Sequence, residues 1–151
     1  MKTGSMLVML GLISSAPAIA ESWQTVAAND TESVRLAESS VRRDGVEVFA
    51  RVLRDYDGTR LNLFEGEWIA HRSMAALYAM DCDLRRLRIV EWTLYAGNLA
   101  QGGALWSGRS RGAAYFRSEK NFGDAALIEA VCTTAPASRI TAATSANADA
   151  Y

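Results

Sequence analysis

Residues 71–97 read HRSMAALYAMDCDLRRLRIVEWTLYAG and carry the strongest secondary-structure signal in the chain. Two runs of alternating residues, 72–80 and 87–95, flank Asp81-Cys82-Asp83, and aspartate favours turns because it bonds nearby backbone amides. The second run is rich in β-branched and aromatic residues, so the stretch predicts a β-hairpin with a cysteine at its bend. Both runs are largely apolar on both faces, which predicts a central place in a sheet. A helix over Met74–Met80 is the alternative, because Met, Ala and Leu are good helix formers.

Further strands are predicted on both sides of this hairpin. The clearest is Val46–Tyr56, which follows an Asp-Gly pair typical of hairpin turns. Trp68 opens the strand that runs into the hairpin, and shorter strands are predicted over residues 23–28, 33–37 and 104–107. Two segments are predicted to be loops because glycines interrupt their pattern, namely Asp57–Gly66 and the basic stretch Gly108–Gly112.

One helix is predicted after the strands. Asn121, with Asp124 three residues later, resembles a capping box at its start. Successive residues of a helix are rotated by about 100° about its axis, which places four residues on one side, Leu127, Ile128, Val131 and Cys132. Glu129 points away from that side. The predicted fold class is α+β: a predominantly antiparallel meander of about six strands with one C-terminal helix packed on the sheet.

The ends of the chain differ in composition from its middle. Residues 1–20 have a basic start, an apolar middle and the small-residue sequence Ala18-Ile19-Ala20, which predicts a signal peptide cleaved before Glu21. No cysteine follows the apolar run, and the run is too short to span a bilayer, so neither a lipid anchor nor a membrane span is predicted. Residues 21–132 are predicted to form one domain. Residues 133–151 are rich in Ala, Ser and Thr and predict a disordered tail.

The chain has only two cysteines, Cys82 and Cys132. An even count in an exported protein predicts one disulfide. A metal site and a redox pair are the alternatives, but the sequence has no C-x-x-C and only one histidine, His71. No metal or other cofactor is expected.

Several short motifs occur together in a fixed order, and through them the chain resembles the surface-adhesin protein E family. The resemblance covers residues 23–132 and rests on Tyr78-Ala-Met-Asp81-Cys82, Arg85-Arg86-Leu87-Arg88, Tyr95-Ala-Gly97-Asn98 and Val131-Cys132. It implies the same sheet-and-helix arrangement, the possibility of a homodimer, and adhesion to extracellular-matrix or other protein partners.

Charge and residue types suggest what such a protein binds. The whole chain has 16 basic and 17 acidic residues, and cleavage of the signal peptide removes one basic residue, Lys2. The mature chain would then have 15 basic and 17 acidic residues, a net charge of −2, so no attraction to nucleic acid is expected. The favoured interpretation of the bend is a solvated or salt-bridged turn, in which neighbouring arginines neutralise Asp81 and Asp83. The alternative is a binding surface of arginines that grip an anionic group, namely Arg85, Arg86, Arg88, Arg109 and Arg111.

Three functions follow as hypotheses. The favoured one is an exported, non-enzymatic binding protein, either periplasmic or secreted. The alternative is a soluble periplasmic module that binds an envelope component. A small hydrolase that uses His71 as a general base is disfavoured, because no nucleophile stands in a recognisable setting, and no catalytic residue is assigned.

Overall fold

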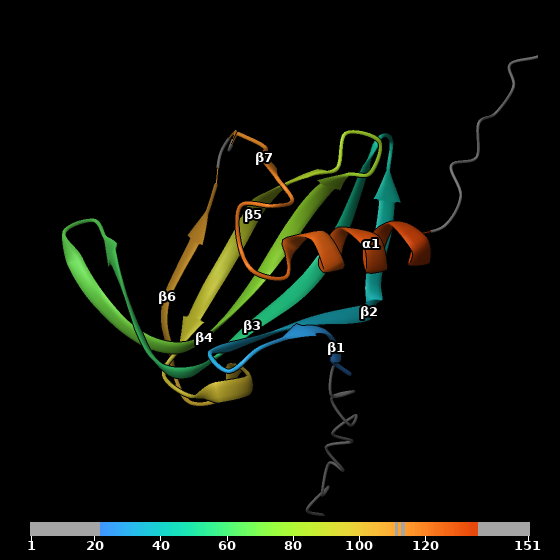
Figure 1. Cartoon of the computed structure of the whole chain (residues 1–151). Helices are drawn as coiled ribbons and strands as arrows, with labels where there is room; N and C mark the ends of the chain where they lie inside the picture. The colour runs from blue at the N-terminus through green and yellow to red at the C-terminus, as the bar shows by residue number, and fades with distance from the viewer. Residues whose placement is uncertain (1–21, 111, 113, 136–151) are drawn as a thin grey trace, which may run out of the picture.

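The computed structural model describes residues 22–110, 112 and 114–135, and shows a single antiparallel sheet with one helix laid across it (Figure 1). Six strands follow one another in chain order across the sheet, and β7 pairs with β5 at one end. The strands are β1 (Gln24–Ala28), β2 (Glu32–Asp44), β3 (Glu47–Phe64), β4 (Glu67–Asp81), β5 (Arg86–Tyr95), β6 (Ala104–Arg109) and β7 (Phe116–Arg117). A 3-10 turn, η1 (Asn98–Ala100), and helix α1 (Asp124–Thr134) complete the fold. The predicted fold class is confirmed.

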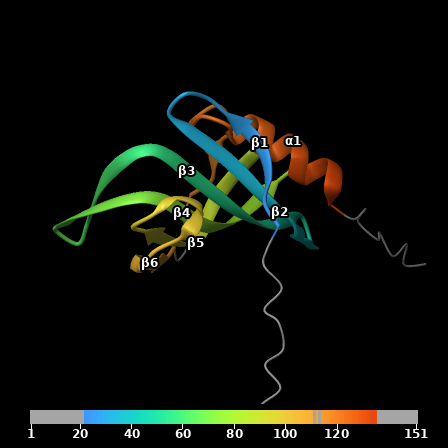
Figure 2. The ribbon, with the colours of Figure 1, turned by 90° about the horizontal axis from the view of Figure 1, so that it is seen from below.

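The hairpin predicted from residues 71–97 is β4 and β5, and β4 lies between β3 and β5 as its two apolar faces predicted. One face of the sheet is covered by α1 (Figure 2). The core lies between them, where three helix residues, Leu127, Ile128 and Val131, pack on alternate residues of β2, β3 and β4. Glu129 is exposed, as predicted. Within the described residues, the opposite face of the sheet carries no helix.

The prediction of a loop over Asp57–Gly66 is wrong. Both strands continue through it and pair from Arg60 opposite His71 to Phe64 opposite Glu67, so β3 and β4 form a long hairpin that extends beyond the other strands (Figures 1 and 2). Glu65 and Gly66 make its turn with positive φ angles of 49° and 88°. The alternation of Arg60, Leu61, Asn62 and Leu63 is a strand pattern, but the glycines and acidic residues around it pointed to a loop. We call residues 57–72 the arm.

The helix begins later than predicted, and the prediction of a capping box that starts at Asn121 is wrong. The N-cap is Gly123, with φ 77° and no side-chain cap, and helical residues run from Asp124. The carboxylate of Asp124 instead bonds to Arg54 of β3 and Asn121. Gly123 lies so close to β2 that a Cβ there would meet Val34 Cγ2 at 2.7 Å, which explains the glycine. The helix ends at Thr134, two residues beyond the predicted domain boundary, and residues 136–151 of the predicted tail lie outside the described residues.

Smaller corrections concern two strands. Residues Gly108 and Arg109 belong to β6 and not to a loop, because they pair with Trp92 and Glu91 of β5. Strand β2 continues past Ala37 to Asp44 through a bulge, where the pairing with β3 shifts register before Arg42.

Candidate binding site

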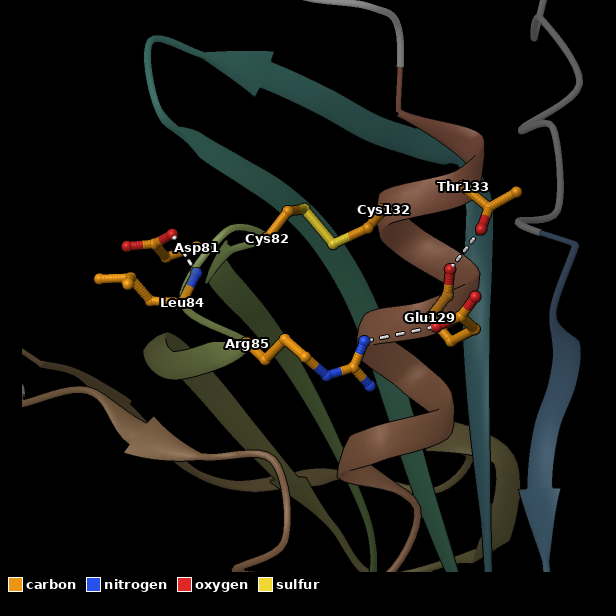
Figure 3. The surroundings of a disulfide bond; sticks show 7 residues. All are labelled: Asp81, Cys82, Leu84, Arg85, Glu129, Cys132 and Thr133. Carbon is orange, nitrogen blue, oxygen red and sulfur yellow. Dashed lines mark hydrogen bonds and ion pairs between the residues drawn. A yellow bond between two sulfur atoms is a disulfide. The ribbon is translucent and has the colours of Figure 1, made fainter.

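A disulfide ties the bend of the β4–β5 hairpin to the last turns of α1, as the cysteine count predicted. Cys82 and Cys132 are bonded, with Cα atoms 5.8 Å apart (Figure 3). Asp81 holds the bend, because its Oδ1 accepts a hydrogen bond from the Leu84 amide at 3.1 Å. An exposed ion pair runs beside the disulfide from Arg85 to Glu129, at 3.5 Å. The last turns of the helix are therefore anchored covalently to the hairpin bend.

The other end of the helix is anchored by a buried arginine. Arg54 donates to the Asp124 carboxylate, to Glu32 Oε1 at 3.0 Å, to the Phe122 carbonyl at 2.9 Å and to the Tyr78 hydroxyl at 3.1 Å. Burial disfavours the charge on Arg54, but Tyr78, Asp124 and Glu32 outweigh it, so the pKa of Arg54 is raised. Burial raises the pKa of Asp124 against the opposing effect of Arg54. This cluster stabilises the fold, because it joins β2, β3 and β4 to the start of the helix.

Three of the predicted binding arginines gather at the hairpin bend, where carboxylates of the same chain face them. Arg86 pairs with Asp81 at 3.0 Å, and Arg88 binds both oxygens of Glu47 at 3.1 and 3.2 Å. The Tyr115 ring lies 4.4 Å from the Arg86 guanidinium carbon, and its hydroxyl donates to Glu47. The bend is thus a network of neutralised charges rather than a concentrated positive patch.

The remaining predicted arginines are not part of that group. Arg109 lies on β6, where it pairs with Glu91 at 3.0 Å. Arg111 lies outside the described residues. The structure therefore brings Arg86 and Arg88 together beside Tyr115, pairs Arg85 with Glu129 of the helix, and places Arg109 on a different surface.

That surface is a groove of about 900 Å³ across the face of the sheet that α1 leaves uncovered. Its floor is made of β4 and β5 residues that alternate with the core positions, including Ala75, Leu77 and Thr93. Its two sides carry hydroxyls and guanidinium groups, from Ser39, Ser40, Arg42 and Arg51 on one side and Ser107 and Arg109 on the other. We call this surface the groove.

The β2 bulge builds one side of the groove. Ser40 Oγ donates to the Ala37 carbonyl at 2.6 Å and accepts from the Arg51 amide at 2.7 Å, which fixes the bulged segment against β3. Arg42 is then held over the Phe49 ring, 4.6 Å from its centre. Sequence reasoning missed this site, because a run of Ser, Val and Arg gives no signal for a bulge.

The lone histidine is buried in the arm's base. His71 is 1% exposed, its Nδ1 lies 3.3 Å from the Ile69 carbonyl oxygen, and its ring meets Tyr56 edge-on. Among the described residues, no group of three or more His, Cys, Asp or Glu side chains comes together as a metal site would need. Within the same residues, no helix has both the length and the apolar character needed to cross a membrane.

Comparison with known proteins gives one family. No curated protein sequence matches the chain. The model of the family described as surface-adhesin protein E matches residues 23–133, a span that includes every described strand and all of α1 except its last residue. This chain therefore belongs to the surface-adhesin protein E family.

Proposed function

We propose that this chain is an exported, non-enzymatic binding protein whose groove holds an extended segment of a protein partner. Membership of an adhesin family supports a binding role. The observation that carries the proposal is the contrast between the two faces of the sheet: one is sealed by α1, and the other is open and hollowed. An open sheet face beside a rigid, disulfide-anchored core is a preformed surface, which lowers the entropic cost of binding.

The chemistry of the groove suits a polypeptide. From β3 on one side to β6 on the other, the groove spans three inter-strand spacings, or about 14 Å, which is the length of roughly four extended residues. Hydroxyl groups and arginines on both sides can donate to backbone carbonyls and to acidic side chains. Glu91 already neutralises Arg109, so Arg42 on the opposite side is the better placed arginine for a partner carboxylate.

Family membership and the disulfide support export, since disulfides persist in oxidising compartments. The partners that we favour are extracellular-matrix proteins, which is what the resemblance to the surface-adhesin protein E family implies. The alternative is a soluble periplasmic module that binds an envelope component. Cell fractionation separates them: exposure on the cell surface or in the medium supports adhesion, and a soluble periplasmic pool supports the module.

Binding to a panel of purified extracellular-matrix proteins, with serum albumin as the negative control, tests the proposal by surface plasmon resonance. Ser107→Trp fills the groove from an exposed position on β6. Ala126→Trp is the matched control, because Ala126 is exposed on α1. We expect Ser107→Trp to abolish binding and Ala126→Trp to preserve it. Equal binding by the two variants would refute the role of the groove.

A further inference from the structure

The arm has two chemically different faces. Pairing of β3 with β4 places six residues on one face, Arg60, Asn62, Phe64, Glu67, Ile69 and His71. This inner face is held to the sheet, because Phe64 stacks on Trp92 and Trp106 with ring centres 6.2 and 6.0 Å apart. The same pairing sets Leu61 opposite Ala70 and Leu63 opposite Trp68 on the outer face.

The outer face of the arm is an exposed apolar patch. Leu61, Leu63 and Trp68 are 61%, 55% and 66% exposed, and they adjoin one another across the two strands. Single exposed apolar residues are ordinary, but three large ones gathered on one projecting hairpin mark an interaction surface.

The tip of the arm is acidic. Glu65 and Glu67 are both exposed, and neither carboxylate has a hydrogen bond or an ion pair within the part of the chain that the structure describes. This contrasts with the arginines of the hairpin bend and of β6, each of which faces a carboxylate of its own chain. The charge at the tip therefore remains available to an outside group.

From these observations we infer that the arm is a second docking element, which inserts into an apolar cleft of a protein partner. The partner carries lysine or arginine residues at the place in the cleft that the tip of the arm reaches. Leu61, Leu63 and Trp68 bury their exposed surface in the cleft, and Glu65 and Glu67 pair with the basic residues. The inference shares with the proposed function only the premise that this domain binds proteins, because none of the arm's residues lines the groove.

The dimensions of the arm favour a partner that encloses it. Two strands of about six residues give a face of roughly 20 by 10 Å, or about 200 Å². A standard interface buries about 800 Å² on each partner, so pairing of this face with a second flat arm supplies too little area. Among the described residues, the backbone after Asp57 and before Ser73 pairs only within the β3–β4 hairpin, so the arm also presents free backbone edges to a surrounding cleft.

The experiment uses three synthetic peptides of equal length with alternating Leu and Lys, Leu and Glu, or Ser and Lys. The full mature chain is titrated into each labelled peptide, and fluorescence anisotropy reports binding. The test variant replaces Leu61, Leu63 and Trp68 by threonine, which suits a strand. The control variant makes the same change at three exposed apolar residues outside the arm, Val46, Leu84 and Leu105.

We expect the wild-type chain to bind the Leu–Lys peptide at least about tenfold more tightly than either other peptide. The arm variant should lose this preference, and the control variant should retain it. A double variant, Glu65→Lys with Glu67→Lys, should reverse the preference, so that the Leu–Glu peptide binds most tightly. Ser107→Trp should also retain it, which separates the arm from the groove.

Three results would overturn the inference. The first is equal binding of the arm variant and the control variant to the Leu–Lys peptide. The second is light scattering that shows a dimer of the wild-type chain and a monomer of the arm variant, which would assign the patch to a second copy. The third is arm-dependent cosedimentation with vesicles of phosphatidylcholine and phosphatidylglycerol, which would assign it to a lipid surface.

Discussion

Arg54 of β3 and Asp124, the first residue of α1, form an ion pair in the interior, with side chains 6% and 0% exposed. Glu32, the Phe122 carbonyl and the Tyr78 hydroxyl accept the other hydrogen bonds of the guanidinium. Because the partners come from three separate parts of the chain, this one arginine joins β2, β4 and the start of the helix to β3.

Asp124→Ala should destabilise the domain by about 3–5 kcal/mol, because it leaves a buried arginine without its main carboxylate. Urea unfolding followed by circular dichroism measures the loss. Glu129→Ala is the control on the same helix: its ion pair with Arg85 is exposed, so its loss should cost at most about 1 kcal/mol. Equal costs for the two variants would contradict the assigned role of the buried pair.

Replacement of both cysteines by serine should lower the free energy of unfolding by about 4 kcal/mol, since Cys82 and Cys132 close a loop with a sequence separation of 50. Urea unfolding with and without dithiothreitol tests this. The reductant should destabilise the wild-type chain and leave the variant unchanged. A wild-type chain insensitive to full reduction would show that non-covalent packing alone fixes the end of α1.

Gly108→Ala should destabilise the sheet by about 1–3 kcal/mol, the usual effect of overpacking. A Cβ at Gly108 would lie 2.3 Å from Cζ2 of Trp92, whose ring also supports Phe64 of the arm. Gly103→Ala is the matched control, because nothing lies within 4 Å of a Cβ there. Thermal unfolding of both variants should show a lower midpoint for Gly108→Ala only. An unchanged midpoint would mean that Trp92 moves aside freely.

Export should remove residues 1–20, so the mature chain begins at Glu21. Mass spectrometry of the protein purified from an exporting host identifies the first residue. Ala18→Arg should block cleavage, because the site needs small residues, whereas Ser14→Ala lies upstream of it and should have no effect. A mature protein that retains Met1 would contradict the predicted signal peptide.

The sequence predicted the parts of this structure that depend on local patterns. Alternation located the β4–β5 hairpin, and helical periodicity located Leu127, Ile128 and Val131 on the buried side of α1. Contacts between distant segments were not predictable. Asp124 looked like a capping residue because its partner Arg54 lies 70 residues away. The pairing of Arg88 with Glu47 and of Arg85 with Glu129 could not be predicted, because these carboxylates are remote in sequence.

The two candidate interaction surfaces were missed for different reasons. The groove depends on a bulge in β2 that moves residues 39–41 out of register, and a bulge leaves no clear trace in the sequence. The arm had a signal, the alternation of Leu61 and Leu63, but Gly58 and Gly66 outweighed it.

We propose that a protein partner occupies the groove on the uncovered face of the sheet. Hydrogen–deuterium exchange of the mature chain, with and without the extracellular-matrix protein that it binds most tightly, tests this most directly. We predict slower exchange in residues 39–42 of β2 and in the facing segments 91–93 of β5 and 107–109 of β6. Protection confined to α1 or to the bend at residues 82–88, with unchanged exchange along the groove, would contradict it.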